Sequence, residues 1–366
     1  MNKEYSLRLG KIEEQLRKSL PAPSGETASW AVRVFPGLET ELSPEAARFL
    51  TEPGAELLSR GGKRWRPLLM TLVCEALGGG DAALPLAPLV EFPHNASLVH
   101  DDIEDNSDMR RGKPAVHILY GVDTAINGGS FLYFLPLSHI ESWDAPADLK
   151  NLVYAVWGAH IRRLHLGQAM DIRWHRDFSS LPSLEAYRLM CRLKTGALAR
   201  LAAMLGVYAA RQAAHTAAHT RKEQESQTKN LAEYLGGAAE RLGVGFQILD
   251  DVVNLRTGNP GKKRGDDIVE GKKSLPILLY LHRRQDRRGW VEACFTAARA
   301  NGSGADEVEA LIGELEGAGI LEEARNQGLA LIREARDVFA GDLLDSPFPA
   351  DTEARKLLAG LVELIS

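Results

Sequence analysis

The spacing of the apolar residues is the feature of this sequence that most constrains its fold. These residues recur mostly at three- and four-residue intervals, whereas alternating β-branched stretches bounded by turns are scarce. Such spacing is typical of helices that bury one face, so we predict an all-α protein. The expected helices cover residues 3–20, 44–59, 64–78, 86–106, 115–142, 147–175, 183–213, 222–256 and 274–284, with more from 288 to the end.

The segments between these helices are short turns rather than domain linkers. They include LPAPSG near residue 20, GGG at 78, GNPGKKRG at 258 and DSPFP at 345. A chain of 366 residues can bury a large core in one domain. We therefore predict a single helical domain over residues 1–366, with its core at about 40–345.

The composition excludes several classes of protein. A net charge of -5 provides no basic field for nucleic acid, so no nucleic-acid partner is expected. Cys74, Cys191 and Cys294 are widely spaced in the sequence. This spacing is typical of reduced thiols in a cytoplasmic protein. The N-terminal segment is charged throughout, and no stretch of about 18 uncharged apolar residues follows it. We expect neither a signal peptide nor a membrane span, and a cytoplasmic location.

Two acidic clusters are the strongest candidates for a functional site. In SLVHDDIEDNSDMRRGKP, Asp101 and Asp105 are four residues apart and share a helix face, with Asp102 beside them. Alone, this cluster is as compatible with a solvated acidic face as with a metal site. In GFQILDDVVN, however, Asp250 and Asp251 lie inside an apolar helix, where acids are hard to leave unpaired. Two such clusters facing each other favour Mg²⁺, which implies a phosphorylated ligand.

Basic residues accompany the acidic clusters. They are Lys63, Arg64 and Arg66 of GGKRWRP, Arg110 and Arg111, Lys194 of KTG, and Lys262, Lys263, Arg264 and Lys272 of GKKRGDDIVEGKKS. Any one of them alone is more often a surface charge. Together with two carboxylate pairs they predict two polyanion sites, one bridged through metal and one held directly by Arg and Lys. No Walker loop or GxGxxG turn indicates a nucleotide.

These segments resemble the trans-isoprenyl diphosphate synthases, or polyprenyl synthetases. The DDxxD motif of that family, followed by an arginine pair, matches DDIED with Arg110 and Arg111. Its other motifs match GGKRWRP, HNASLVHDD, GQAMD, KTG, FQILDDVVN and GDDIVEGKKSLP, from about Gly61 through Pro276. The resemblance implies one helical bundle around a deep central cavity, usually a homodimer. It also implies a reaction of isoprenoid biosynthesis, in which isopentenyl diphosphate extends an allylic diphosphate.

The resemblance also assigns roles to individual residues. About three Mg²⁺ ions are expected per site, held by Asp101, Asp105 and Asp250, with Asp102 and Asp251 in supporting contacts. The allylic diphosphate is assigned to Arg110, Lys194, Lys262 or Lys263, and Lys272, and the isopentenyl diphosphate to Lys63, Arg66, His94 and Arg111. Thr195 and Gln247 are expected to line the path of the carbocation.

Product length is expected to depend on the residues just before the first acidic cluster. Ala96 and Ser97 are small, whereas in the resembled family an aromatic residue at either position forms a floor that stops chain growth. We therefore expect a product of C20 or longer. Phe131 and Phe134 of FLYF are the candidates for the next floor.

Two residues depart from the family pattern. Asn254 stands where the second motif usually has a third aspartate, and its amide oxygen can still reach a metal-bound water. Pro93 lies inside the helix that carries the first motif, where it removes a backbone hydrogen bond and is expected to bend the helix.

Two alternative functions share the acidic motifs. A class I terpene cyclase has the same fold and is slightly favoured by Asn254, but it needs no isopentenyl site. A non-catalytic partner subunit of a prenyl synthase has no use for two intact acidic motifs. The cations Lys63, Arg66, His94 and Arg111 favour the chain-elongating prenyltransferase.

Overall fold

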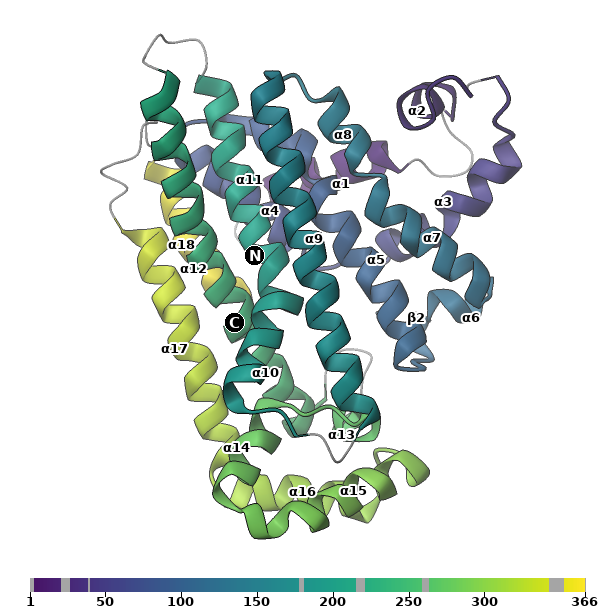
Figure 1. Ribbon diagram of the computed structural model, residues 1–366, viewed down its shortest axis with the longest axis vertical. Coiled ribbons are helices and arrows are strands. Elements are labelled where there is room, and N and C mark those ends of the chain that lie inside the picture. The colour runs from purple at the N-terminus through teal and green to yellow at the C-terminus, as the bar shows by residue number, and fades with distance from the viewer. Residues whose placement is uncertain are drawn as a thin grey trace. The chain divides into compact units, whose positions relative to one another are not determined.

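The computed structural model describes residues 3–20, 27–38, 40–177, 181–214, 221–258, 263–341 and 352–365, and these are almost entirely helical (Figure 1). The longer helices are α1 (Lys3–Ser19), α3 (Pro44–Ser59), α4 (Trp65–Ala76), α5 (Pro88–Glu104), α7 (Val122–Phe134), α9 (Ala147–Arg176), α11 (Ala197–Ala214), α12 (Arg221–Arg256), α15 (Arg288–Asn301), α16 (Asp306–Gly317), α17 (Ile320–Ala340) and α18 (Thr352–Ile365). The shorter ones are α2 (Thr27–Val34), α6 (Val116–Tyr120), α8 (Leu137–Ser142), α10 (Leu184–Cys191), α13 (Asp266–Glu270), α14 (Leu275–Arg283) and the short 3₁₀ or π segments η1 (Gly80–Leu86), η2 (Arg192–Gly196) and η3 (Gln285–Arg287). The prediction of an all-α protein is confirmed.

The chain divides into two compact units. Unit 1 consists of Met1–Ile161, Leu198–Gly237 and Val338–Ile365, and unit 2 of Arg162–Ala197 and Ala238–Asp337. The single domain expected from the sequence stays a prediction. Within the described residues, no helix is long and apolar enough to cross a bilayer.

Unit 1 is organised around α4 and α5. Every residue of α4 from Trp65 to Cys74 is buried, as expected for a helix that is apolar on all sides. It packs against α18, while α5 packs against α7 and α3. These contacts hold α5, whose last turn carries the first acidic cluster.

Pro93 lies in the middle of α5 without ending the helix. Because proline has no N–H, the carbonyl oxygen of Leu89 loses its usual helical donor. The buried indole of Trp157, from α9, replaces that donor, and its Nε1 lies 3.0 Å from the Leu89 oxygen. The helix therefore continues through the proline to Glu104.

Several predicted boundaries differ from the structure. The segment 115–142 forms α6, α7 and α8, because Gly121 adopts a left-handed φ of 86° and Pro136 precedes α8. The hairpin of β1 (Met109–Arg110) and β2 (Lys113–Pro114) was not predicted. Its two turn residues, Arg111 and Gly112, have φ of 52° and 75°, as a tight hairpin requires. The eight-residue α2 was missed because it is too short to show a helical period.

Unit 2 has its own core, which involves α10, α12, α14, α15 and α16. Tyr187, Tyr280 and Phe295 are its largest fully buried side chains. Within this unit α12 and α17 approach closely, since a Cβ at Gly245 would lie 2.7 Å from the Gly328 oxygen.

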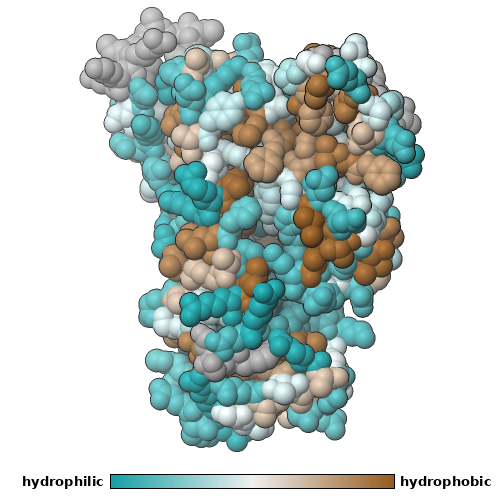
Figure 2. All heavy atoms as spheres, turned by 45° about the vertical axis from the view of Figure 1, so that its right-hand side comes forward, coloured by the Kyte–Doolittle hydropathy of each residue, from teal (hydrophilic) through white to brown (hydrophobic). Residues whose placement is uncertain are grey.

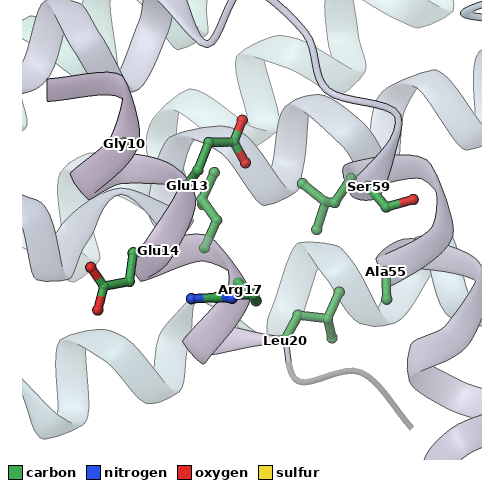
Figure 3. A pocket seen from close by; sticks show the side chains of 9 residues that line it. Gly10, Glu13, Glu14, Arg17, Leu20, Ala55 and Ser59 are labelled. Carbon is green, nitrogen blue, oxygen red and sulfur yellow. The ribbon is translucent and has the colours of Figure 1, made fainter. Parts of the chain in front are cut away.

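A cavity of about 570 Å³ lies between α1 and α3 in unit 1 (Figure 3). It is lined by Gly10, Glu13, Glu14, Leu16, Arg17, Leu20, Ala55, Leu58 and Ser59. No residue assigned to a diphosphate or a metal ion lines this cavity.

Candidate active site

The GGKRWRP segment forms a strained turn that begins α4. Gly61, Gly62 and Arg64 have φ of 75°, 146° and 45°, a left-handed region that residues other than glycine rarely adopt. A Cβ at Gly62 would also lie 3.2 Å from the guanidinium of Arg111. The turn places Arg66 in the first helical turn of α4, whose free N–H groups favour an anion.

The structure brings the cations assigned to the isopentenyl diphosphate together in unit 1. Burial and the charge of Arg111 lower the pKa of Arg66 to about 10, although Glu91 opposes them. Burial, together with the charge of Arg64, likewise lowers the pKa of Arg111 to about 10. Burial and then the charges of Arg66 and Arg111 hold the pKa of His94 well below its ordinary value, so this imidazole is neutral. Such crowded, buried cations suit an anionic ligand.

Arg111 is held by backbone and amide oxygens rather than by a carboxylate. Its Nη1 donates to the carbonyl oxygens of Leu57, at 3.3 Å, and Gly61, and lies 3.4 Å from Oδ1 of Asn95. These contacts fix the guanidinium without cancelling its charge. Lys63, on the same turn, is exposed.

The first acidic motif separates into a buried acid and two half-buried ones. Asp102 is fully buried and accepts hydrogen bonds from Nε of Arg110, at 2.8 Å, and from its Nη2. Burial raises the pKa of Asp102 in spite of this partner. Its Oδ2 is buried and has no hydrogen-bond partner among the described residues. Asp101 and Asp105 lie half-buried at the end of α5, and Arg110, assigned to the allylic diphosphate, is bound to Asp102.

The second acidic motif, in unit 2, also combines a buried acid with an exposed one. Asp251 accepts hydrogen bonds from Oη of Tyr187 at 2.7 Å and from Nε2 of Gln247 at 3.0 Å. Burial and the nearby charge of Asp267 raise the pKa of Asp251 to about 7. Asp250 is exposed on the surface of α12. In both motifs one acid is therefore anchored while its neighbour faces outward.

Lys194 and Thr195 lie on a π-helical turn, η2, between α10 and α11. Nζ of Lys194 lies 2.6 Å from Oδ2 of the buried Asp171, and Oγ1 of Thr195 donates to Gln247 at 2.8 Å. Burial raises the pKa of Asp171, but Lys194 and His175 outweigh it and hold the pKa well below its ordinary range. The turn packs directly on the backbone of α9, because a Cβ at Gly167 would lie 2.8 Å from the Leu193 carbonyl carbon. π turns of this kind are frequent at functional sites.

Asn254 has a structural role that the sequence did not reveal. It is fully buried, its Oδ1 accepts a hydrogen bond from the Asp267 N–H at 3.2 Å, and its backbone oxygen accepts one from the Gly265 N–H at 3.1 Å. The expectation that its amide oxygen reaches a metal-bound water is wrong, because that oxygen is inside the protein and supports the start of α13.

The remaining assigned cations lie near the same part of unit 2. Lys272 contacts Glu270 at 2.5 Å and Asp267 at 3.6 Å. Lys263 is exposed, and its backbone N–H donates to Asp266. Lys262 lies outside the described residues.

The residues assigned to product length divide between interior and surface. Ala96 is fully buried, and the hydroxyl of Ser97 donates to the His94 carbonyl oxygen at 2.7 Å. Phe131 is half-buried and lies in a cluster with Trp30 and Phe35, with ring centroids 6.3 and 6.0 Å away. Phe134 is 66% exposed, so of the two aromatic candidates Phe131 points inward.

The carboxylates suit Mg²⁺ bound together with phosphate oxygens. Among the described residues, no group of three or more His, Cys, Asp or Glu side chains forms a metal cage. Mg²⁺ is usually bound by one or two carboxylates plus waters and substrate phosphates, so the Asp101 and Asp105 pair fits such an ion.

Sequence reasoning missed Glu91 and Asn95, which lie among the assigned cations. Both are fully buried in α5, and Nδ2 of Asn95 donates to Oε1 of Glu91 at 3.0 Å. The available signal was a carboxylate and an amide four residues apart in the apolar run LVEFPHNASL, where neither is expected without a partner.

Comparisons with known proteins identify the family of this chain. The family model for polyprenyl synthetase matches residues 47–314. The chain is 30% identical over 326 residues to a geranylfarnesyl diphosphate synthase of Aeropyrum pernix, covering 86% of this chain and 93% of that protein. The structure of a geranylgeranyl pyrophosphate synthetase from Pyrococcus horikoshii Ot3 matches with a TM-score of 0.76 and 27% identity, over 99% of this chain and 96% of that one. The chain therefore belongs to the polyprenyl synthetase family, and it is an enzyme of the prenyltransferase class.

Proposed function

We propose that this protein is a Mg²⁺-dependent trans-prenyltransferase. It joins isopentenyl diphosphate to an allylic diphosphate, releases diphosphate and gives a product of C20 or longer. One observation carries the proposal: unit 1 contains both a carboxylate pair at the end of α5 and a separate group of buried cations. Asp101 and Asp105 suit a metal-bridged diphosphate, whereas Arg66, Arg111 and the neutral His94 suit one bound directly. A reaction between two diphosphates needs both kinds of site.

The reaction begins when the allylic carbon–oxygen bond breaks and the electron pair leaves with the diphosphate. Asp101 and Asp105 would hold Mg²⁺, which would supply positive charge that stabilises this leaving group. Asp250 is the ligand expected from the second acidic motif. Lys194 adds a further cation, and Thr195 and Gln247 present polar groups to the carbocation. The double bond of isopentenyl diphosphate then attacks the cation, and one proton is lost to the departing diphosphate. No protein nucleophile is needed.

Both alternative functions lose support. A terpene cyclase was favoured by Asn254, but that residue is a buried structural partner of Asp267. A cyclase also has no use for the crowded cations Arg66 and Arg111. A non-catalytic subunit has no need of anchored acids such as Asp251 in a second motif.

The proposed product length rests on the α5 residues before the acids. Ala96 and Ser97 have small side chains, and Phe131, which packs against Trp30 and Phe35, is the aromatic proposed for the next floor. The relatives named above are synthases of geranylfarnesyl and geranylgeranyl products, which is the range proposed here.

We also propose that the enzyme is a homodimer in the cytoplasm. Val122, Ile126 and Phe134 are 49%, 46% and 66% exposed and recur on one face of α7, while Ile118 and Leu119 of α6 are 54% and 47% exposed. Figure 2, in which this side of the molecule comes forward, shows apolar atoms gathered at the surface. A patch of this kind marks a protein interface. The three cysteines are free and buried, which suits a reducing compartment.

One incubation tests the proposed activity. Purified protein, Mg²⁺, an allylic diphosphate and labelled isopentenyl diphosphate should give a labelled, longer prenyl diphosphate. Asp101→Ala should lower turnover by several powers of ten, each corresponding to about 1.4 kcal/mol of barrier. A labelled product that forms equally well in excess chelator would contradict the metal assignment, and an unlabelled cyclic hydrocarbon would indicate a cyclase.

A further inference from the structure

Arg64 differs from the other cations of the GGKRWRP turn because its side chain is already fully engaged inside unit 1. Its Nε lies 2.7 Å from Oε1 of Glu13, its Nη1 lies 2.7 Å from Oε1 of Glu91, and its Nη2 donates to the Leu58 oxygen at 2.6 Å. The side chain is only 1% exposed. These bonds connect the turn to α1, α3 and α5.

The backbone of Arg64 explains why the turn needs such an anchor. Its φ of 45° is unfavourable for a side-chain-bearing residue, and such strain persists only where the surroundings enforce it. Lys63 directly precedes Arg64, and Arg66 follows two residues later. Any relaxation of Arg64 would therefore turn both assigned diphosphate ligands.

Glu91 is the second half of the anchor. Its side chain is 3% exposed, and its Oε1 accepts hydrogen bonds from Arg64 and from Nδ2 of Asn95, whose Oδ1 faces Arg111. Glu91 also opposes the lowering of the pKa of both Arg66 and Arg111. The buried carboxylate of Glu91 thus offsets the charge of several buried guanidinium ions. It also fixes the positions of Arg64 and Asn95.

We propose that Arg64 and Glu91 are positioning residues for the isopentenyl diphosphate site, and that Arg64 itself does not bind diphosphate. This inference rests on the proposed function. The Arg64–Glu91 pair holds the turn in its left-handed conformation and keeps Arg66 and Arg111 aimed at one anion. The Glu91 charge also retains Arg64, which would otherwise compete for the same diphosphate oxygens.

Glu91→Gln is the decisive variant because the two possible roles of Arg64 predict opposite signs. If the pair positions the turn, loss of the Glu91 charge loosens the turn and weakens isopentenyl diphosphate binding by about tenfold or more. If Arg64 is a direct ligand, removal of its buried competitor leaves affinity unchanged or raises it. Titration calorimetry with isopentenyl diphosphate and metal-free protein measures this directly. Arg64→Lys, which keeps the charge but loses the three-way fork, should weaken binding in the same direction.

Steady-state kinetics give a second readout. Glu91→Gln should raise KM for isopentenyl diphosphate by about tenfold and change KM for the allylic substrate by less than about threefold. Glu75→Gln is the matched control, since Glu75 forms a comparable part-buried pair with Arg8, at 2.6 Å, and touches no assigned residue. It should lower stability and leave both KM values unchanged.

A double variant distinguishes a folding defect from weak binding. If circular dichroism shows that Glu91→Gln is unfolded, the double variant Arg64→Gln with Glu91→Gln removes both members of the buried pair, leaves the net charge of the protein unchanged and should fold. The folded double variant should still bind isopentenyl diphosphate weakly. Normal affinity in that protein, or in folded Glu91→Gln, overturns the inference. Wild-type protein that neither binds isopentenyl diphosphate nor forms product overturns the proposed function instead.

Discussion

The hydrogen bond between Trp157 and the Leu89 carbonyl should stabilise the protein only because residue 93 is proline. Trp157→Phe leaves the Leu89 oxygen buried without a donor, which costs about 1–3 kcal/mol. The lost indole area, about 40 Å², adds about 1 kcal/mol at 25 cal/mol per Å². We therefore expect Trp157→Phe to lower the free energy of unfolding by about 2–4 kcal/mol.

Pro93→Ala provides the test of this reasoning. Alanine restores an N–H that reaches the Leu89 oxygen within α5, so Trp157→Phe in that background should cost only the area term, about 1 kcal/mol. The coupling energy between the two sites should thus be about 1–3 kcal/mol. Urea unfolding followed by circular dichroism measures the four free energies, and hydrogen exchange of α5 peptides shows where protection is lost.

Trp30→Phe is the matched control for the cycle. The Trp30 indole also donates to a backbone oxygen, that of Ser19 at 3.2 Å, but that oxygen lies at the end of α1 and not in α5. The loss of unfolding free energy caused by Trp30→Phe should be the same with proline or alanine at position 93. Equal costs for Trp157→Phe in both backgrounds would refute the explanation of how α5 tolerates its proline.

Three further predictions concern single side chains. Burial and then the charge of Arg299 lower the pKa of Lys273 from 10.5 to about 8. The charged lysine therefore lowers the stability of the folded protein below pH 8, and this loss of stability is relieved as the pH rises towards 10.5. Relative to Lys273→Met, wild type should gain about 3 kcal/mol of stability across that window, and a constant difference in urea midpoints would contradict this. Ser97→Phe should shorten the product, as chromatography of dephosphorylated chains would show, and an unchanged length would remove the argument from cavity depth. Asn254→Asp introduces a buried carboxylate next to Asp267, so thermal unfolding should show a loss of about 1–3 kcal/mol that grows above about pH 4, rather than tighter Mg²⁺ binding.

Local patterns in the sequence predicted most of the fold. The apolar spacing located α3, α5, α9 and α12 to within a few residues, because each helix buries a continuous face. The errors arose where a single backbone conformation decides, as at Gly121, which separates α6 from α7.

The candidate site was less predictable because its contacts join distant segments. Asp101 and Asp105 follow from spacing within one helix, whereas the partner of Asp102 comes from a hairpin that no periodicity indicated. Asn254 could be recognised as unusual, but its bond to the Asp267 N–H depends on how the chain returns thirteen residues later. Partners of this kind are set by tertiary structure and cannot be read from local sequence.

The contact at Gly167 limits how this protein can vary. Because the π turn that carries Lys194 lies against the bare backbone of α9, even a methyl group at position 167 would displace it. Replacement of every residue in turn should therefore show position 167 to be as intolerant as the assigned acids, although its glycine takes no part in the chemistry. Steric exclusion therefore restricts which residues position 167 can hold. A redesign of α9 has to keep glycine there.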